Sequence, residues 1–360
     1  MNIKEATAAY ENWLGKKIPL IAVDLKLKHQ RMAEGAFPFL RATFYRWAQL
    51  WPGTCPALAK APVVLGVGDL HVENFGTWRD SEGRLVWGVN DFDEVCALPY
   101  LVDLVRLAVS EFLATAEGTG VCQPEEACEA ILDGYTQGIQ RGGNPFVLAE
   151  HHPVLRGLAL NELRDPVRFW DKISSWPRAG KTPPNIQSIL KRALPEAGLP
   201  FQILHRRAGL GSLGRRRFTL VAQWRGGYIA REAKELVPSA WHCFDRKQSA
   251  KIFYTAAITR AIRVADPMLS VQNGWVIRRL APDCSRIELS QLPVKRDGLK
   301  LLHAMGFETA NVHLGTPGAA KKIATDLRKR PSGWLYKAAR AMEQATVSDW
   351  KQWREASDAK

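Results

Sequence analysis

The sequence predicts an α+β fold in which a smaller, strand-rich part lies between two helical stretches. Residues 1–175 contain long segments with apolar residues at three- and four-residue spacing, which is typical of helices. Residues 186–290 are rich in β-branched and aromatic residues between glycine turns, which indicates strands. Residues 291–360 return to a helical pattern. We therefore expect a helical lobe, a small β-rich lobe, and C-terminal helices that pack on the helical lobe.

The first fifty residues have a helical pattern with one apolar stripe. After Pro38, aromatic and aliphatic residues recur at helical spacing as far as Trp51, and Pro52-Gly53 ends the helix. Such a stripe is more typical of a packed core than of a cofactor pocket.

Two short strands each run directly into a group of polar side chains. Pro62–Val67 leads to Gly68-Asp69, and Leu85–Val89 leads to Asn90-Asp91, with Ser81–Gly83 as the turn between them. Pairing of these two strands would bring Asp69 and Asp91 together.

Asp69, Asn74, Asp91 and Asp93 form a set of oxygen donors with a recognisable chemistry. The carboxylate of Asp69 can orient a nucleophile, whereas Asn74 and Asp91 can hold Mg²⁺ on the phosphates of a nucleotide. Asp93 is either a second metal ligand or an anchor of its loop. The alternative is that Asp69 and Asn74 only cap turns, as these residue types often do.

The G-x-G-x-x-G sequence from Gly209 to Gly214 is interpreted from its flanks. A dinucleotide-binding unit needs a helix after the glycines, but Arg215–Gln223 has the composition of a strand. A turn at Arg225–Gly227 follows, and then a strand that ends in Lys234. This order is the phosphate-covering arrangement of protein kinases. Five arginines flank the loop and add to its attraction for polyphosphate, at positions 206, 207, 215, 216 and 217.

Further elements are expected on both sides of the strand-rich part. Tyr100–Ala116 is predicted as a buried helix, whose Asp103 and Arg106 should pair with other charges or brace a loop. Phe244–Val264 is predicted as a helix and Trp275–Leu280 as a strand.

Composition limits the partners and the compartment. The net charge of +14 predicts an acidic partner, such as nucleotide phosphates, a phosphorylated metabolite or a nucleic acid. The six cysteines have neither Cys-x-x-Cys nor metal-ligand spacing, which favours reduced thiols. Neither a signal peptide nor a membrane span is evident, so we expect a cytoplasmic protein that does not bind membranes.

With these motifs in view, the chain resembles a largely uncharacterised bacterial family, domain of unknown function 2252, through most of its length. That family is similar to the protein-kinase-like superfamily, close to aminoglycoside phosphotransferases. The resemblance is carried by the segments at residues 31–33, 37–41, 68–76, 90–94, 209–214, 234–235 and 238–239.

The resemblance implies a two-lobed, kinase-like fold that uses ATP and Mg²⁺, with roles for particular residues. Asp69 matches the catalytic aspartate, Asn74 and Asp91 match the metal ligands, and Asp103 matches the aspartate that braces the catalytic loop. The implied nucleotide-binding residues are Gly209, Gly211, Ser212, Gly214 and Lys234.

The sequence departs from the kinase pattern in two respects. The catalytic loop precedes the glycine loop here, so the fold would be circularly permuted, which is compatible with termini that lie close together. In addition, Phe244–Val264 contains no glutamate to pair with Lys234.

We therefore expect an ATP- and Mg²⁺-dependent phosphotransferase acting on a hydroxyl of an unidentified acceptor, with an anionic acceptor as one option. Adenylyl transfer on the same fold is a variant of this hypothesis. The alternative class is an inactive nucleotide sensor or a basic nucleic-acid-binding module. A nucleic acid is less favoured as a partner because no helix-turn-helix or aromatic-interleaved basic motif is present.

Overall fold

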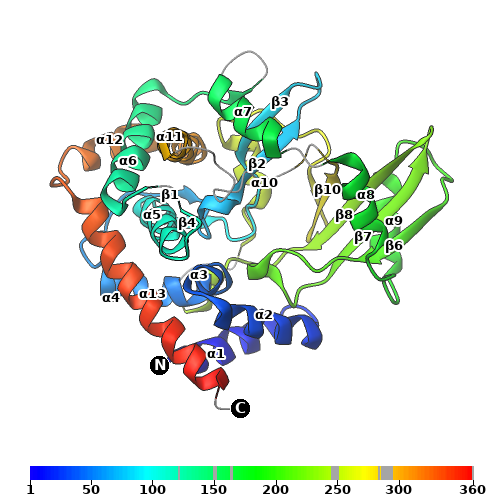
Figure 1. Ribbon diagram of the computed structural model, residues 1–360, viewed down its shortest axis with the longest axis horizontal. Coiled ribbons are helices and arrows are strands. Elements are labelled where there is room, and N and C mark those ends of the chain that lie inside the picture. Colours follow the sequence, from blue (N-terminus) through cyan, green and yellow to red (C-terminus); the bar gives the residue numbers. More distant parts are fainter. Residues whose placement is uncertain are drawn as a thin grey trace.

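The structure, a computed structural model, describes residues 1–120, 122–148, 152–162, 165–244, 251–282, 284 and 295–358. This part of the chain has a mixed α+β fold, as the sequence predicts. A five-stranded antiparallel sheet lies to one side, and helices with two smaller sheets form the rest (Figure 1).

The N-terminal segment folds into helices that are shorter than expected. The helices are α1 (Ile3–Gly15), α2 (Ala22–Glu34), α3 (Ala36–Ala42) and α4 (Phe44–Thr54). The single helix predicted after Pro38 is interrupted at Thr43, whose φ of −126° and ψ of 40° are not helical. The hydroxyl of Thr43 donates to the carbonyl of Phe39 at 2.7 Å, a local bond that competes with the helical pattern.

The predicted pairing of the two strands before the acidic motifs is wrong. The strands of this region are β1 (Val63–Gly66), β2 (Phe75–Arg79), β3 (Leu85–Val89) and β4 (Cys96–Pro99). β1 pairs with β4, whereas β3 pairs with β2 and with β5 (Phe146–Val147). The turn after β2 explains this, because Asp80 Oδ1 accepts from the amides of Glu82 and Arg84 and closes a short hairpin that gives β3 its nearest partner.

The helical core is built around α5 (Leu101–Ala116), which is buried from Leu101 to Ala114. Around it lie α6 (Pro124–Arg141), α11 (Lys295–His313), α12 (Ala319–Leu327) and α13 (Trp334–Asp358). α6 and α11 approach closely because both carry glycine at their contact; a Cβ at Gly134 or Gly306 would collide with the backbone of the facing helix. α13 also packs on α1, so the two ends of the chain lie on the same side of the molecule (Figure 1).

The large sheet has the strand order β6-β7-β8-β10-β9. Its strands are β6 (Phe201–His205), β7 (Arg217–Trp224), β8 (Gly227–Glu235), β9 (Ser270–Gln272) and β10 (Trp275–Leu280). α9 (Pro184–Arg192) packs on one face through Ile186, Ile189 and Leu190. α8 (Pro166–Ser174) packs on part of the other face through Phe169 and Ile173. The rest of that second face borders the site described below.

The helix predicted over Phe244–Val264 is only partly observed. Residues 245–250 lie outside the described part of the chain, and 251–253 are not helical. The helix that is described, α10, covers Tyr254–Arg260. A further helix, α7 (Pro153–Glu162), connects the helical part with α8.

Two general features bear on the expected compartment. Among the residues that the structure describes, no helix combines the length and apolar character that crossing a membrane would require. All six cysteines are free thiols, and four of them are buried. Cytoplasmic localisation stays a prediction.

A buried glutamate holds the end of β3, directly before Asn90-Asp91. Glu308 of α11 accepts from the amide of Val89 at 3.1 Å and from the side chain of Asn311 at 2.8 Å. Burial raises the pKa of Glu308 to about 7, against the opposing effect of Arg263. The folded state therefore holds this proton at pH values where the unfolded chain has released it.

We expect Glu308→Gln to remove part of the loss of stability that the wild type shows between pH 4.5 and pH 8. Because the pKa of Glu308 is higher in the folded state, its stability contribution is present below about pH 4.5 and is lost as the pH rises through 7. Glutamine is uncharged like the protonated acid, so the gap between variant and wild type should move by roughly 1–3 kcal/mol in favour of the variant from pH 4.5 to pH 8. Its amide nitrogen replaces one of the two accepting oxygens, which adds a loss of stability that does not depend on pH. Urea unfolding at both pH values measures this.

Glu82→Gln is the matched control, since Glu82 is exposed in the β2–β3 turn. Equal losses of stability between pH 4.5 and 8 in wild type and Glu308→Gln would contradict the assignment.

Candidate functional site

A cleft of about 660 Å³ separates the large sheet and its glycine loop from the two acidic loops of the helical part. Seven of the site residues predicted from the sequence line it, namely Asp69, Asn74, Asp91, Asp93, Gly209, Gly211 and Ser212. Gly214 and Lys234 do not. The fold thus brings together residues that are more than a hundred positions apart in the sequence.

The loop that carries Asp69 is anchored on α5. Asp103 accepts from the amides of Val67 and Gly68 at 2.6 and 2.8 Å, the bracing that the resemblance implies. Gly68 has φ +81°, and a Cβ there would lie 2.5 Å from the carbonyl of Glu94, so only glycine suits this position. The loop is therefore fixed before any ligand binds.

Arg106 orients the carboxylate of Asp69. Its Nε lies 3.0 Å from Oδ1, its Nη2 contacts the same oxygen, and Nη2 also donates to the carbonyl of Leu40 at 2.8 Å. The guanidinium lies over the rings of Phe44 and Trp47. Burial raises the pKa of Asp69 above its usual value, although the charge of Arg106 opposes this.

Asn74 connects the two acidic loops. Its side-chain Nδ2 donates to the backbone carbonyls of Asp69 and Asp91 at 3.1 and 3.3 Å. The backbone carbonyl of Asn74 accepts from the backbone amide of Asn90 at 3.1 Å. This connection, rather than pairing of β1 with β3, brings Asp69 and Asp91 together. Since the amide nitrogen is used, the side-chain oxygen of Asn74 is the atom left for a ligand in the cleft.

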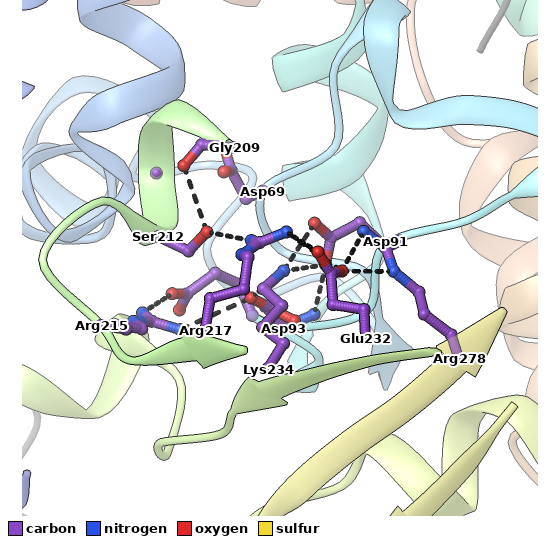
Figure 2. A network of polar contacts seen from close by, with 12 residues as sticks. Asp69, Asp91, Asp93, Gly209, Ser212, Arg215, Arg217, Glu232, Lys234 and Arg278 are labelled. Carbon is purple, nitrogen blue, oxygen red and sulfur yellow. Dashed lines mark hydrogen bonds and ion pairs between the residues drawn. The ribbon is translucent and has the colours of Figure 1, made fainter. Parts of the chain in front are cut away.

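Lys234 reaches Asp91 and Asp93 from β8 of the large sheet and contacts both carboxylates (Figure 2). Its Nζ is 3.0 Å from Asp91 Oδ2, whereas the two carboxylates line the cleft and Lys234 does not. Burial alone would raise the pKa of Asp91, but Lys234 lowers it below the usual range; burial and the charge of Asp91 raise the pKa of Asp93. The ammonium, which contacts no glutamate among the residues that the structure describes, thus compensates part of the charge of the two aspartates.

The glycine loop lies against Asp69. A Cβ at Gly211 would lie 2.9 Å from the carbonyl of Arg41 and 3.3 Å from Asp69 Oδ2, so glycine permits this approach. The carbonyl of Gly209, whose φ is +74°, accepts from the amide and hydroxyl of Ser212 at 3.0 and 3.1 Å. Gly214 instead faces α2, where a Cβ would meet Leu25.

The five arginines near the glycine loop are less available to a ligand than their number predicts. Each pairs with a carboxylate, through the contacts Arg206–Glu232, Arg207–Asp24, Arg215–Glu94, Arg216–Glu235 and Arg217–Glu232. Much of the local positive charge is therefore compensated within the protein.

Several residues that shape the site were not found from the sequence. Glu94 binds Arg215 and accepts from the amide of Ala240 at 2.6 Å, which connects the acidic loop to the chain after β8. Glu232 and Arg278 form an ion pair beside the cleft at 2.7 Å. Both lie on predicted strands, and the two-residue alternation places Glu232 on the same face as Lys234.

We expect Arg106→Met to destabilise the protein by about 3–5 kcal/mol at neutral pH, because it removes a fully buried cation and leaves the partly buried carboxylate of Asp69 without its partner. Since the pKa of Asp69 is already raised, loss of Arg106 raises it further, and protonation relieves the isolated charge at low pH. The deficit should therefore be smaller at pH 5 than at pH 8, as measured by urea unfolding.

Arg225→Met serves as the control, because Arg225 forms an ion pair with Glu196 and its side chain is 74% exposed. A deficit in Arg106→Met that does not change with pH would show that Asp69 is not the group left uncompensated.

Comparison with known proteins gives one match. A family model described as "Uncharacterized protein conserved in bacteria (DUF2252)" matches residues 20–152, the segment that contains both acidic loops. Neither a curated protein nor a solved structure matches the chain. The similarity to this family therefore covers Asp69, Asn74, Asp91 and Asp93, but not the glycine loop or Lys234.

Proposed function

We propose that the protein is a kinase-like phosphotransferase that uses ATP and Mg²⁺ and transfers a phosphoryl group to an acceptor hydroxyl. The observation that carries this proposal is the convergence of Asp69, Asn74, Asp91 and the glycine loop on one cleft. Phosphoryl transfer depends mainly on positioning and charge stabilisation, which such an arrangement can supply.

The order of the strands supports a kinase-like fold in permuted form. The glycine loop joins the first two strands of the large sheet, and Lys234 lies on the third, as the lysine of protein kinases does. The acidic loops precede this sheet in the chain. Contact between α1 and α13 is compatible with a permutation, because the ends of the chain are close.

The donor set fits Mg²⁺. The oxygen donors on this side of the cleft are Asp91, Asp93 and the side-chain amide oxygen of Asn74. Among the described residues no three His, Cys, Asp or Glu side chains gather as metal ligands, so phosphate oxygens and water would complete the set. Asp93 Oδ1 is buried and has no hydrogen-bond partner within the described chain, which favours a cation next to it. Mg²⁺ prefers such oxygen ligands together with phosphate oxygens and water. When bound, it would neutralise charge on the phosphates.

Asp69 would accept the proton of the acceptor hydroxyl. Arg106 binds Oδ1, and Oδ2 points towards the glycine loop, so one oxygen is held and the other remains for the acceptor. The raised pKa of Asp69 makes it a better proton acceptor than an exposed aspartate.

The glycine loop would cover the nucleotide phosphates with its backbone amides. Lys234 holds Asp91 and Asp93 at the edge of the cleft, and the resemblance to kinases also implies contact of its ammonium with a phosphate.

A non-catalytic nucleotide sensor is the second candidate. The position of Lys234 behind the carboxylates favours it, since the ammonium does not line the cleft. Binding of nucleic acid receives less support, because the arginines around the glycine loop are paired with carboxylates.

We expect Mg²⁺ with ATP to raise the melting temperature of the wild type, and Asp91→Ala to lose the Mg²⁺-dependent part of this rise. At a hundredfold excess over Kd a ligand stabilises by about 2.7 kcal/mol, which a thermal-shift assay resolves. Asp133→Ala is the control, because the side chain of Asp133 is 75% exposed on α6, away from the cleft.

Asp69→Asn should keep nucleotide binding and lose turnover by roughly 10²–10⁴-fold, the usual contribution of a catalytic base. ATP labelled in the α- or the γ-phosphate separates phosphoryl from adenylyl transfer. Nucleotide binding without turnover in the wild type would favour the sensor, and an unchanged thermal shift in Asp91→Ala would contradict the metal site.

A further inference from the structure

A cluster of three arginines shares one buried glutamate beside the cleft. Glu232 of β8 is fully buried and contacts Arg206 at 2.7 Å. It also contacts Arg217 at 3.2 Å and Arg278 at 2.7 Å (Figure 2). The strand register explains the arrangement, because Arg278 of β10 lies opposite Glu232 and Arg217 of β7 lies opposite Lys234.

The guanidinium groups lie between Glu232 and the cleft. Arg206, Arg217 and Arg278 line the cleft, whereas Glu232 does not. Glu232 uses only Nη1 of Arg206 and Nε with Nη2 of Arg278. Nη2 of Arg206 and Nη1 of Arg278 form no hydrogen bond with the residues that the structure describes, and neither atom is buried. Donors of this cluster therefore remain for a ligand.

The cluster carries an excess of positive charge. Three guanidinium groups face one carboxylate, which leaves two positive charges uncompensated within the cluster. Burial lowers the pKa of Arg206, and the charges of Arg217 and Arg278 lower it further against the effect of Glu232. Because partly buried cations are costly without counter-ions, a dianion would bind here favourably.

We propose that Arg206 and Arg278 form a binding subsite for a phosphate group, separate from the nucleotide phosphates expected beside Asp91 and Asp93. Guanidinium groups match the geometry of phosphate oxygens, and Arg217 is fixed behind them by its bond to Ser212 at 2.9 Å. Glu232 and Lys234 are two residues apart on one face of β8, which separates the two positions by about 7 Å.

The assignment of this phosphate to a substrate depends on the proposed function, but phosphate binding itself does not. The group belongs either to a phosphorylated acceptor or to a phosphate of the nucleotide other than those beside Asp91 and Asp93. In both cases the ligand of the cleft carries anionic groups at two positions.

The test measures binding of inorganic phosphate by isothermal titration, without Mg²⁺ or nucleotide and at constant ionic strength. Arg206→Gln and Arg278→Gln should each weaken binding by roughly 10–100-fold, because each removes a charge-assisted bond. Arg225→Gln, far from the cleft on the β7–β8 turn, should bind as the wild type does.

Glu232→Gln distinguishes a ligand site from a purely structural cluster. Removal of its negative charge should strengthen phosphate binding by several-fold in the folded variant, whereas a structural role predicts no gain. If this variant does not fold, the two arginine variants decide the question. Wild-type affinity in folded Arg206→Gln and Arg278→Gln, or the absence of any gain of affinity in folded Glu232→Gln, would overturn the proposal.

Competition with ATP identifies the source of the phosphate. Loss of phosphate binding in the presence of ATP assigns the subsite to the nucleotide, and undiminished binding assigns it to the acceptor. If the titration detects no phosphate binding, phosphoryl transfer stays open, because the titration contains no Mg²⁺. Conversely, a protein that shows no phosphoryl transfer can still bind phosphate at this subsite.

Discussion

Charge compensation in a partly buried cleft is the constraint on which the arrangement of this protein depends. Carboxylates cannot be removed from water without cations or hydrogen-bond donors. Asp91 forms an ion pair with Lys234, 143 residues later in the chain, and Glu94 forms one with Arg215, 121 residues later. These ion pairs connect the acidic loops to the large sheet, so the same contacts define the site and join the two parts of the chain.

The local elements of the site were predictable because they depend on short-range patterns. The strands around the glycine loop contain β-branched and aromatic residues that favour β structure, and α5 has apolar residues at most of its positions. Asp69 and Asn74 are five residues apart, which lets a single loop present both. By contrast, pairing of β1 with β4 depends on which edge is free after the β2–β3 hairpin closes, and single-strand patterns do not contain that information.

The charges were harder to predict than the backbone. Five arginines in twelve residues indicate an anionic ligand, yet each of them has a carboxylate partner. Three pair with Glu232 or Glu235 of β8, and the other two pair with Asp24 and Glu94 from earlier in the chain. Arg278 lies outside any motif, and only the register of β10 against β8 shows that it reaches Glu232. A sequence shows how many charges a segment carries, whereas the pairing that decides which charges remain for a ligand is a property of the tertiary structure.

The two charged groups of the cleft differ in sign, and this difference couples their proposed ligands. Asp91 and Asp93 with Lys234 hold one negative charge in excess, whereas the cluster around Glu232 holds two positive charges in excess. Arg278 acts on both, since its charge lowers the pKa of Asp91 as well as binding Glu232. A divalent cation beside the aspartates would reverse the local sign and make the neighbouring anion position more favourable. By linkage, an anion bound at Arg206 and Arg278 would strengthen cation binding by the same factor. The cleft is thus suited to a metal ion and a polyanion together better than to either alone.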